Sequence, residues 1–243
     1  MRELNIQPQS LVGVIITHLH GDHVGGLEQL IWERYYGGES GPKFMTTAVA
    51  AAPDVLDDVR RVVEPQVRWF TTSTGEVGDQ GWLRLVDAWQ WPAGRADGAG
   101  VSRAIEIGGV LFSLHSTPHV SASSGGKASY GVCVRSPDAE LYFTSDTEFR
   151  ADIGSRFPNA TAIFHDCTFY DHFDGTVHTH YSQLLTLPPA VRRRVVLMHH
   201  TQVPSDIDPV VDGFSNVANR FDTFEVGDFG ARKIGDCTAD QPR

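Results

Sequence analysis

Apolar runs and helical periodicity define the elements expected before residue 70. The run at residues 11–17 is almost entirely apolar and predicts a buried strand. Residues 24–31 follow with apolar side chains at the spacing of one helix face. A short strand is expected at residues 43–47, and a helix at residues 54–63 with Asp54 as its N-cap. The pattern therefore begins with strand, helix, strand and helix.

Strands predominate after residues 71–100, a glycine- and tryptophan-rich stretch that fits no single period. Gly108 and Gly109 are typical of a hairpin turn. Helices are expected at residues 181–187 and 214–220, and the tail from residue 227 is polar. The expected strands lie at residues 101–107, 110–116, 129–135, 141–145, 161–165 and 195–198. This mixture is typical of two sheets packed face to face with helices outside.

Composition narrows the class of protein and of partner. A chain of 243 residues with 41% hydrophobic residues is expected to form one globular domain over residues 1–243. Its 30 acidic and 20 basic residues give a net charge of -10, which disfavours nucleic acid as a partner. The three cysteines form no CxxC pair, and there is no signal peptide or long apolar span. We therefore expect a soluble, cytoplasmic protein without a membrane partner.

Three histidines and one aspartate crowd into the six residues that follow the first strand. They are His18, His20, Asp22 and His23, placed on a strand-to-helix turn that directs them to one region. Imidazole and carboxylate together suit a divalent ion, most often zinc. His18 and His20 can reach one metal, and Asp22 and His23 can reach a second. A plain helix start capped by Asp22 explains less, because four such groups rarely crowd so closely by accident.

This HxHxDH pattern resembles the first metal motif of the metallo-β-lactamase fold hydrolases, and every position of that motif is present. The resemblance implies an α+β fold, a four-layer αββα sandwich with two metals at one edge. Two further segments are similar to the branch that contains tRNase Z and phosphodiesterases. Residues 163–169 resemble its His-Glu-Ala-Thr-Phe segment, with Asp166 for the glutamate, and residues 178–180 resemble its Gly-His-Ser-Thr segment.

The same resemblance implies the remaining metal ligands. His119 follows the strand at residues 110–116 and matches the third metal histidine, although His115 within that strand is an alternative. Asp146 matches the bridging aspartate of a Gly-Asp-Thr motif, in which Ser145 replaces the glycine. The last metal histidine corresponds to His199, with the adjacent His200 as the alternative.

The implied site holds two Zn²⁺ ions, with Mn²⁺ or Fe as alternatives. His18, His20 and His119 bind the first ion, Asp22, His23 and His199 bind the second, and Asp146 bridges them. A hydroxide shared by the metals attacks the substrate. Asp22 is also a candidate catalytic residue, and His178 or His180 protonates the leaving group.

The expected substrate is a small phosphodiester or similar small ester. After His199 the chain lacks the Ser-Arg-Tyr segment of tRNase Z proteins, and it lacks a basic, glycine-rich arm for gripping tRNA. Hydrolysis of a lactone, thioester or β-lactam is an alternative that uses the same chemistry. A second alternative is a non-catalytic metal- or partner-binding remnant of a truncated enzyme.

The short segment before the metal motif is the unusual feature of the sequence. Similar proteins place several strands before this motif, whereas only residues 11–17 read as a strand here. We therefore expect a fold that lacks its first N-terminal strands, with an open sheet edge beside residues 11–17. The alternatives are a truncated start, a minimal domain, or a sheet completed by another chain, such as a second copy in a homo-oligomer. The stability of the chain is expected to be poor or to depend on such a partner.

Overall fold

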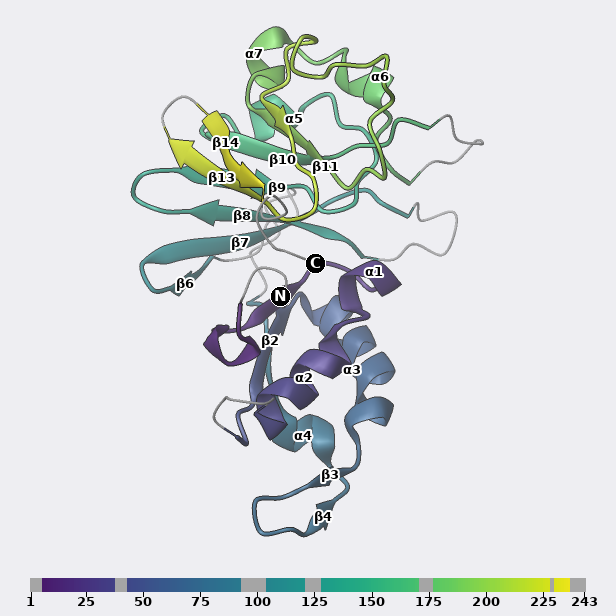
Figure 1. The fold of residues 1–243 in the computed structure, drawn as a ribbon, viewed down its shortest axis with the longest axis vertical. Coiled ribbons are helices and arrows are strands. Elements are labelled where there is room, and N and C mark those ends of the chain that lie inside the picture. Colours follow the sequence, from purple (N-terminus) through teal and green to yellow (C-terminus); the bar gives the residue numbers. More distant parts are fainter. Residues whose placement is uncertain are drawn as a thin grey trace. The chain divides into compact units, whose positions relative to one another are not determined.

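The computed structural model describes residues 6–37, 43–92, 104–120, 128–170, 177–227 and 230–236. The chain divides into two compact units, residues 1–93 and 94–243 (Figure 1), and each is described by itself. The expectation of a single domain stays a prediction. The first residues of the strand expected at 101–107 lie outside the described residues.

The first unit contains a parallel three-stranded sheet in the order β1-β2-β5. The strands are β1 (Val14–Ile16), β2 (Thr47–Ala51) and β5 (Val86–Gln90). A short hairpin follows the longest helix and consists of β3 (Phe70–Thr71) and β4 (Val77–Gly78). The helices are η2 (Pro8–Ser10), α1 (Gly21–Val24), α2 (Leu27–Tyr36), α3 (Pro53–Val67) and α4 (Gly81–Leu85).

Helix α3 shows how the apolar pattern produces this packing. Val55, Val59, Val63 and Val67 recur every fourth residue, and each is at most 3% exposed. Pro53 is the first residue of the helix. An N–H group at that position would have no partner within the helix, so the lack of one in proline costs no hydrogen bond. The helix predicted at residues 54–63 is confirmed and runs longer. Asp54 is not its N-cap, because that position belongs to Ala52.

Two other expectations for this unit are corrected. The strand predicted at residues 43–47 is wrong, since β2 starts at Thr47 and Phe44 bends the chain with a φ of 65°. Strand β2 is alanine-rich and mostly buried as the central strand of a parallel sheet, so it shows no alternation. The single helix read at residues 24–31 is two helices, α1 and α2, interrupted at Gly25 and Gly26.

The second unit is built on a seven-stranded mixed sheet in the order β12-β11-β10-β9-β8-β7-β6. Strands β6 to β9 pair antiparallel, and β9 to β12 pair parallel. The strands are β6 (Ile105–Ile107), β7 (Val110–Ser116), β8 (Tyr130–Arg135), β9 (Glu140–Phe143), β10 (Ala162–Asp166), β11 (Val195–Met198) and β12 (Asn216–Val217). The helices are α5 (Ile153–Arg156), α6 (Tyr181–Leu184) and α7 (Pro189–Arg192).

The C-terminal part of this unit differs from the sequence expectation. The helix predicted at residues 214–220 is wrong, because β12 lies there and pairs parallel with β11. Within the polar tail an antiparallel hairpin forms from β13 (Asp222–Gly227) and β14 (Gly230–Asp236). The alternating half-buried and exposed pattern of β13 contains few strongly apolar residues, so the sequence signal for a strand is weak.

Strand β1 forms one edge of the first sheet. It pairs with β2 on one side, and no other described strand pairs with it. Val12, just before β1, is 70% exposed. An open edge beside residues 11–17 was expected and is present in the described part of the chain. None of the described helices is long and apolar enough to cross a membrane.

The buried side chain of Arg34 anchors the segment that leads into β1. Its guanidinium donates hydrogen bonds to the carbonyl groups of Pro8, Leu11 and Thr46, at 2.6 to 3.2 Å. Arg34 is only 5% exposed, and its hydrogen bonds to the three carbonyl groups are partly buried. One side chain of α2 therefore fixes the start of β1 against the start of β2.

We predict that Arg34→Ala lowers the free energy of unfolding by about 3 kcal/mol, because it removes the packing of a buried side chain and its partly buried, charge-assisted hydrogen bonds to three carbonyl groups. Arg34→Lys should recover little, since a single ammonium group cannot span three carbonyl groups. Urea denaturation at matched metal content measures the change, with Arg60→Ala on the exposed face of α3 as the control. Equal stability of Arg34→Ala and Arg60→Ala would contradict the role given to Arg34.

Candidate metal site

In the first unit the HxHxDH motif follows β1. His18 and His20 lie in the turn after the strand, and Asp22 and His23 lie within α1. His18 is 1% exposed, and its ring lies 4.8 Å from that of His20 and 4.0 Å from that of His23, measured between centroids. The Asp22 Oδ2 atom lies 3.5 Å from His23 Nε2. His20 is the N-cap residue of α1 and has extended backbone angles, so the turn is set by the start of the helix. The local cluster expected from the sequence is present.

The second unit places its site residues at one edge of the seven-stranded sheet. His119, Asp146 and His199 each follow a strand by one to three residues, after β7, β9 and β11 respectively. Asp166 is the last residue of β10. These four strands run in the same direction, so their carboxyl ends meet at the same edge of the sheet. Ligands often bind at such an edge.

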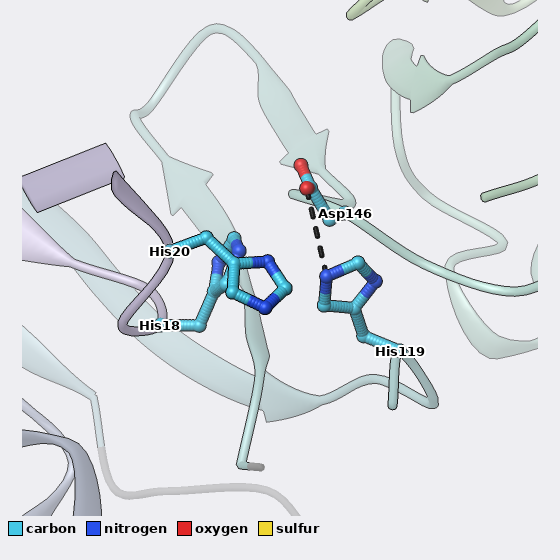
Figure 2. A group of neighbouring side chains, drawn as sticks. All are labelled: His18, His20, His119 and Asp146. Carbon is cyan, nitrogen blue, oxygen red and sulfur yellow. Dashed lines mark ion pairs between the residues drawn. The ribbon is translucent and has the colours of Figure 1, made fainter. Parts of the chain in front are cut away.

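Asp146 turns its two carboxylate oxygens toward two different histidines. Its Oδ2 atom lies 3.6 Å from His119 Nε2, the pair joined by the dashed line in Figure 2. Its Oδ1 atom lies 3.5 Å from His199 Nε2. Asp146 is 2% exposed. Both distances exceed those of good hydrogen bonds.

The opposite ring nitrogens of these histidines are held by acceptors. His119 Nδ1 donates to the carbonyl oxygen of Val177 at 2.8 Å. His199 Nδ1 lies 3.3 Å from Asp166 Oδ1. An acceptor at Nδ1 keeps the proton there and turns the Nε2 lone pair toward Asp146. Histidines that bind metals are usually oriented in this way.

Asp166 is a fully buried carboxylate between two histidines. Its Oδ2 atom accepts hydrogen bonds from His178 Nδ1 at 2.8 Å and from the backbone N–H of Thr147 at 2.9 Å. Burial alone would raise the pKa of Asp166, but the hydrogen bonds from His178, His199 and Thr147 outweigh it and lower that pKa. The same hydrogen bond to Asp166 raises the pKa of His178, against the opposing effect of burial.

This donor set fits a divalent metal. Asp146, Asp166, His178 and His199 each offer one ligand atom, and these atoms lie within 4.8 Å of one another. His178 and Asp166 hydrogen-bond each other, so Asp146 and His199 are the members of this group left to bind a metal. Imidazole nitrogens and carboxylate oxygens suit zinc and related ions.

The contacts in the structure distinguish between the histidines that the sequence left as alternatives. His180 Nδ1 accepts from the backbone N–H of Ser182 and caps α6, so this ring serves the helix start. His115 hydrogen-bonds Ser113 Oγ through Nε2 at 2.9 Å and packs on Phe157. Burial lowers the pKa of His115 to about 4, which suits a neutral histidine inside a sheet.

His200 lies apart from the carboxylates that surround His199. Its ring packs edge-on against Phe169 at 5.8 Å, and burial lowers its pKa. His199 has a φ of 63°, and this left-handed backbone angle marks the end of β11. The geometry therefore favours His178 over His180, His119 over His115, and His199 over His200 as the site residues.

Sequence reasoning missed the hydroxyl groups that join the site loops. Thr117 and Ser129 donate to the carbonyl oxygen of Asp146, at 3.5 and 3.3 Å. Thr179 donates to the carbonyl oxygen of Thr147 at 2.9 Å. The available signal was that Thr117 and Thr179 lie within two residues of His119 and His178, whereas Ser129 is not close in sequence to any site residue.

The chain matches one family and one fold. The family model described as "Anti-Pycsar protein Apyc1" matches residues 1–56 and 81–224. A relative from Paenibacillus sp. (strain J14), named anti-Pycsar protein Apyc1, is 27% identical over 198 residues, which cover 79% of this chain and 69% of the relative.

Among solved structures, the metallo-β-lactamase fold protein YhfI from Bacillus subtilis matches with a TM-score of 0.56 and 14% identity. That match covers 88% of this chain and 76% of YhfI. The short form of human tRNase Z matches with a TM-score of 0.56 and 16% identity, over 96% of this chain and 82% of the enzyme. The expected metallo-β-lactamase fold is confirmed. The fold and the cluster of histidine and aspartate residues together support the prediction that the protein is a metallohydrolase.

Ser145 occupies the position where the resembling motif has glycine, and it has a φ of 54°. A side chain in this left-handed region costs about 1–2 kcal/mol. We predict that Ser145→Gly raises the free energy of unfolding by about 0.5–1 kcal/mol, the gain being reduced by the greater freedom of glycine in the unfolded chain. Chemical denaturation measures it, with Ser145→Ala as the control that keeps Cβ. A lower free energy of unfolding in Ser145→Gly would contradict the backbone strain inferred at Ser145.

Proposed function

Because the chain belongs to the anti-Pycsar protein Apyc1 family, we propose that it is a metal-dependent phosphodiesterase that hydrolyses a cyclic nucleotide. The observation that carries the proposal is the Asp146 carboxylate, whose two oxygens face His119 and His199. A carboxylate placed in this way can bridge two cations. Two metal ions held close together in this way can stabilise both the attacking and the leaving oxygen of a phosphodiester.

The proposed site joins the two groups of residues described above. His18, His20 and His119 would hold one Zn²⁺, and Asp22, His23 and His199 would hold the other, with Asp146 between them. The support is the number and type of donors that the two units offer, together with the complete HxHxDH motif. When bound, the ions would lower the pKa of a coordinated water molecule to near neutrality, and they would stabilise negative charge on a phosphoryl group.

His178 is the proposed general acid, with its proton at the ring nitrogen opposite Asp166. The hydrogen bond from Nδ1 to Asp166 orients the ring and raises the pKa of His178, so the imidazolium form persists to higher pH. A histidine with this pKa shift can give a proton to a departing ribose oxygen. Asp166 positions His178 and His199 together, and so links the acid to a metal ligand.

The substrate class is inferred from the family and from charge. The family name suggests a phosphodiesterase that degrades cyclic nucleotides. A chain with a net charge of -10 would repel a long polyanion more strongly than a small monoanion. Lactone, thioester and β-lactam hydrolysis remain the alternative activities, and metal binding without turnover is the alternative without catalysis.

We predict that the metal-loaded protein hydrolyses cyclic nucleotides faster than lactone, thioester or β-lactam substrates. Asp146→Asn should abolish that turnover and release at least one metal, because an amide cannot neutralise two cations. Product analysis by chromatography and elemental analysis measure both effects, with Asp138→Asn on the exposed turn before β9 as the control. Two tightly bound metals and a normal rate in Asp146→Asn would contradict the bridge.

His178→Ala should lower kcat by about 10²–10⁴-fold while the metal content stays unchanged. In Asp166→Asn the alkaline loss of kcat should move to lower pH, because the pKa of His178 is no longer raised by a carboxylate. The pH profile of kcat measures this shift. His180→Ala is the matched control and should destabilise α6 while leaving the rate near normal. If His180→Ala has the larger rate effect, the two roles must be exchanged.

A further inference from the structure

His165 is a fully buried histidine that the proposed reaction does not use. It is 0% exposed and lies directly before Asp166, the last residue of β10. It belongs to the segment at residues 163–169 that resembles the His-Glu-Ala-Thr-Phe segment of the tRNase Z-like branch. Asp166 is the residue of that segment to which the proposed site gives a function. A histidine in a buried strand needs its own explanation, because a polar ring is costly there unless it is hydrogen-bonded.

Strand β10 places the His165 ring and the Asp166 carboxylate on opposite faces of the sheet. Ile163 and Cys167 belong to the core cluster that includes residues of α5 and α6, whereas Phe164 belongs to the cluster on the other face. Because side chains alternate along a strand, His165 lies on the same face as Ile163 and Cys167. His165 can therefore act on the site only through the backbone of its own strand.

The contact that His165 makes with the backbone is a buried hydrogen bond. Its Nδ1 atom donates to the carbonyl oxygen of Asp166 at 2.7 Å, since a carbonyl oxygen can only accept. Burial lowers the pKa of His165, so the ring is neutral and Nε2 carries no proton. Nε2 is buried without a hydrogen-bond partner among the described residues. A leucine would fill this apolar position without leaving a polar atom unpaired, so the bond to Asp166 is what the histidine adds.

The residue held by His165 is the one whose carboxylate orients two histidines of the site. Asp166 Oδ2 accepts from His178 Nδ1 at 2.8 Å, and Oδ1 lies 3.3 Å from His199 Nδ1. The backbone N–H of Asp166 donates to Thr144 Oγ1 at 3.0 Å. Side chains therefore hold both main-chain polar groups of Asp166. Fixing these two groups fixes the direction in which the carboxylate leaves the strand.

We propose that His165 is a positioning residue, whose hydrogen bond to the Asp166 carbonyl fixes the carboxylate that orients His178. The inference rests on the proposed role of His178 as the general acid. A shift of about 1 Å in a catalytic group can cost on the order of 10²-fold in rate. Loss of the His165 donor should therefore lower kcat and leave KM unchanged, because no contact with substrate is removed.

Two amide substitutions separate the hydrogen bond from the size of the side chain. In His165→Asn the amide nitrogen takes the place of Nδ1 and can donate to the Asp166 carbonyl, although the side chain is smaller. In His165→Gln the amide lies one bond further from the backbone, although the size is closer to histidine. We expect His165→Asn to keep a kcat close to that of the parent. His165→Gln and His165→Leu should lower kcat by up to about 10²-fold at unchanged metal content.

The ring ¹⁵N chemical shifts of His178 give a readout that does not depend on turnover. In the zinc-loaded, ¹⁵N-histidine-labelled protein, at a pH at which the ring is neutral, they report which nitrogen carries the proton. His178→Ala identifies the signals. The parent and His165→Asn should carry the proton on Nδ1, opposite Asp166. His165→Leu should show a mixture of the two tautomers, because the acceptor is no longer held in place.

Ile163→Val, a buried change on the same face of β10, is the matched control for lost packing and should leave kcat and the His178 shifts unchanged. Unchanged His178 shifts in His165→Leu, or a loss of kcat in His165→Asn as large as in His165→Leu, would overturn the positioning role. A parent that hydrolyses no cyclic nucleotide but shows the expected change in the His178 shifts would support the positioning role and contradict the proposed phosphodiesterase activity alone.

Discussion

The buried carboxylate of Asp166 organises the part of the site that belongs to the second unit. It accepts from His178, lies beside His199, and accepts the backbone N–H that follows Asp146. A buried charge of this kind is tolerated only when its hydrogen bonds replace the lost hydration. Those bonds also fix two imidazole rings and the loop that carries Asp146. Loss of the carboxylate would therefore disturb the proposed acid, a proposed metal ligand and the proposed bridge together.

The sheet explains why these residues come together from distant parts of the chain. Strands β7, β9, β10 and β11 run in the same direction, and their carboxyl ends form one edge. Each loop that leaves this edge contributes one polar side chain. The hydroxyl groups of Thr117, Ser129 and Thr179 then join the loops to one another. The regular sheet sets the approximate positions, and the hydroxyl groups refine them.

The sequence drew attention to the residues of the candidate site, and their role as ligands stays a prediction. His18 lies in a motif whose spacing indicates metal chemistry, whereas His119, Asp146 and His199 were predicted from the resemblance to metallo-β-lactamase fold hydrolases. Strand β2 was misplaced because its alanines have a low intrinsic preference for strands and are buried by neighbours that the local sequence does not show.

The positioning contacts were harder to predict because they are made by main-chain groups. The Val177 carbonyl that holds His119 leaves no mark on the sequence, since every residue has such a group. The helix expected at residues 214–220 failed for a similar reason. The backbone N–H groups of Ser215 and Ala218 donate to carbonyl groups of β11, and this pairing between segments distant in sequence overrides local periodicity.

The two groups of proposed ligands differ in how they depend on folding. His18, His20, Asp22 and His23 are near neighbours in the chain and stay close together even when it is unfolded. His119 and Val177 are 58 residues apart, and Thr117 and Asp146 are 29 apart, so those contacts exist only after long loops have closed. A metal that also binds the unfolded chain stabilises the native state less than its affinity suggests. The ligands of the second unit would therefore set how far metal binding resists unfolding, while the local motif would capture metal early during folding.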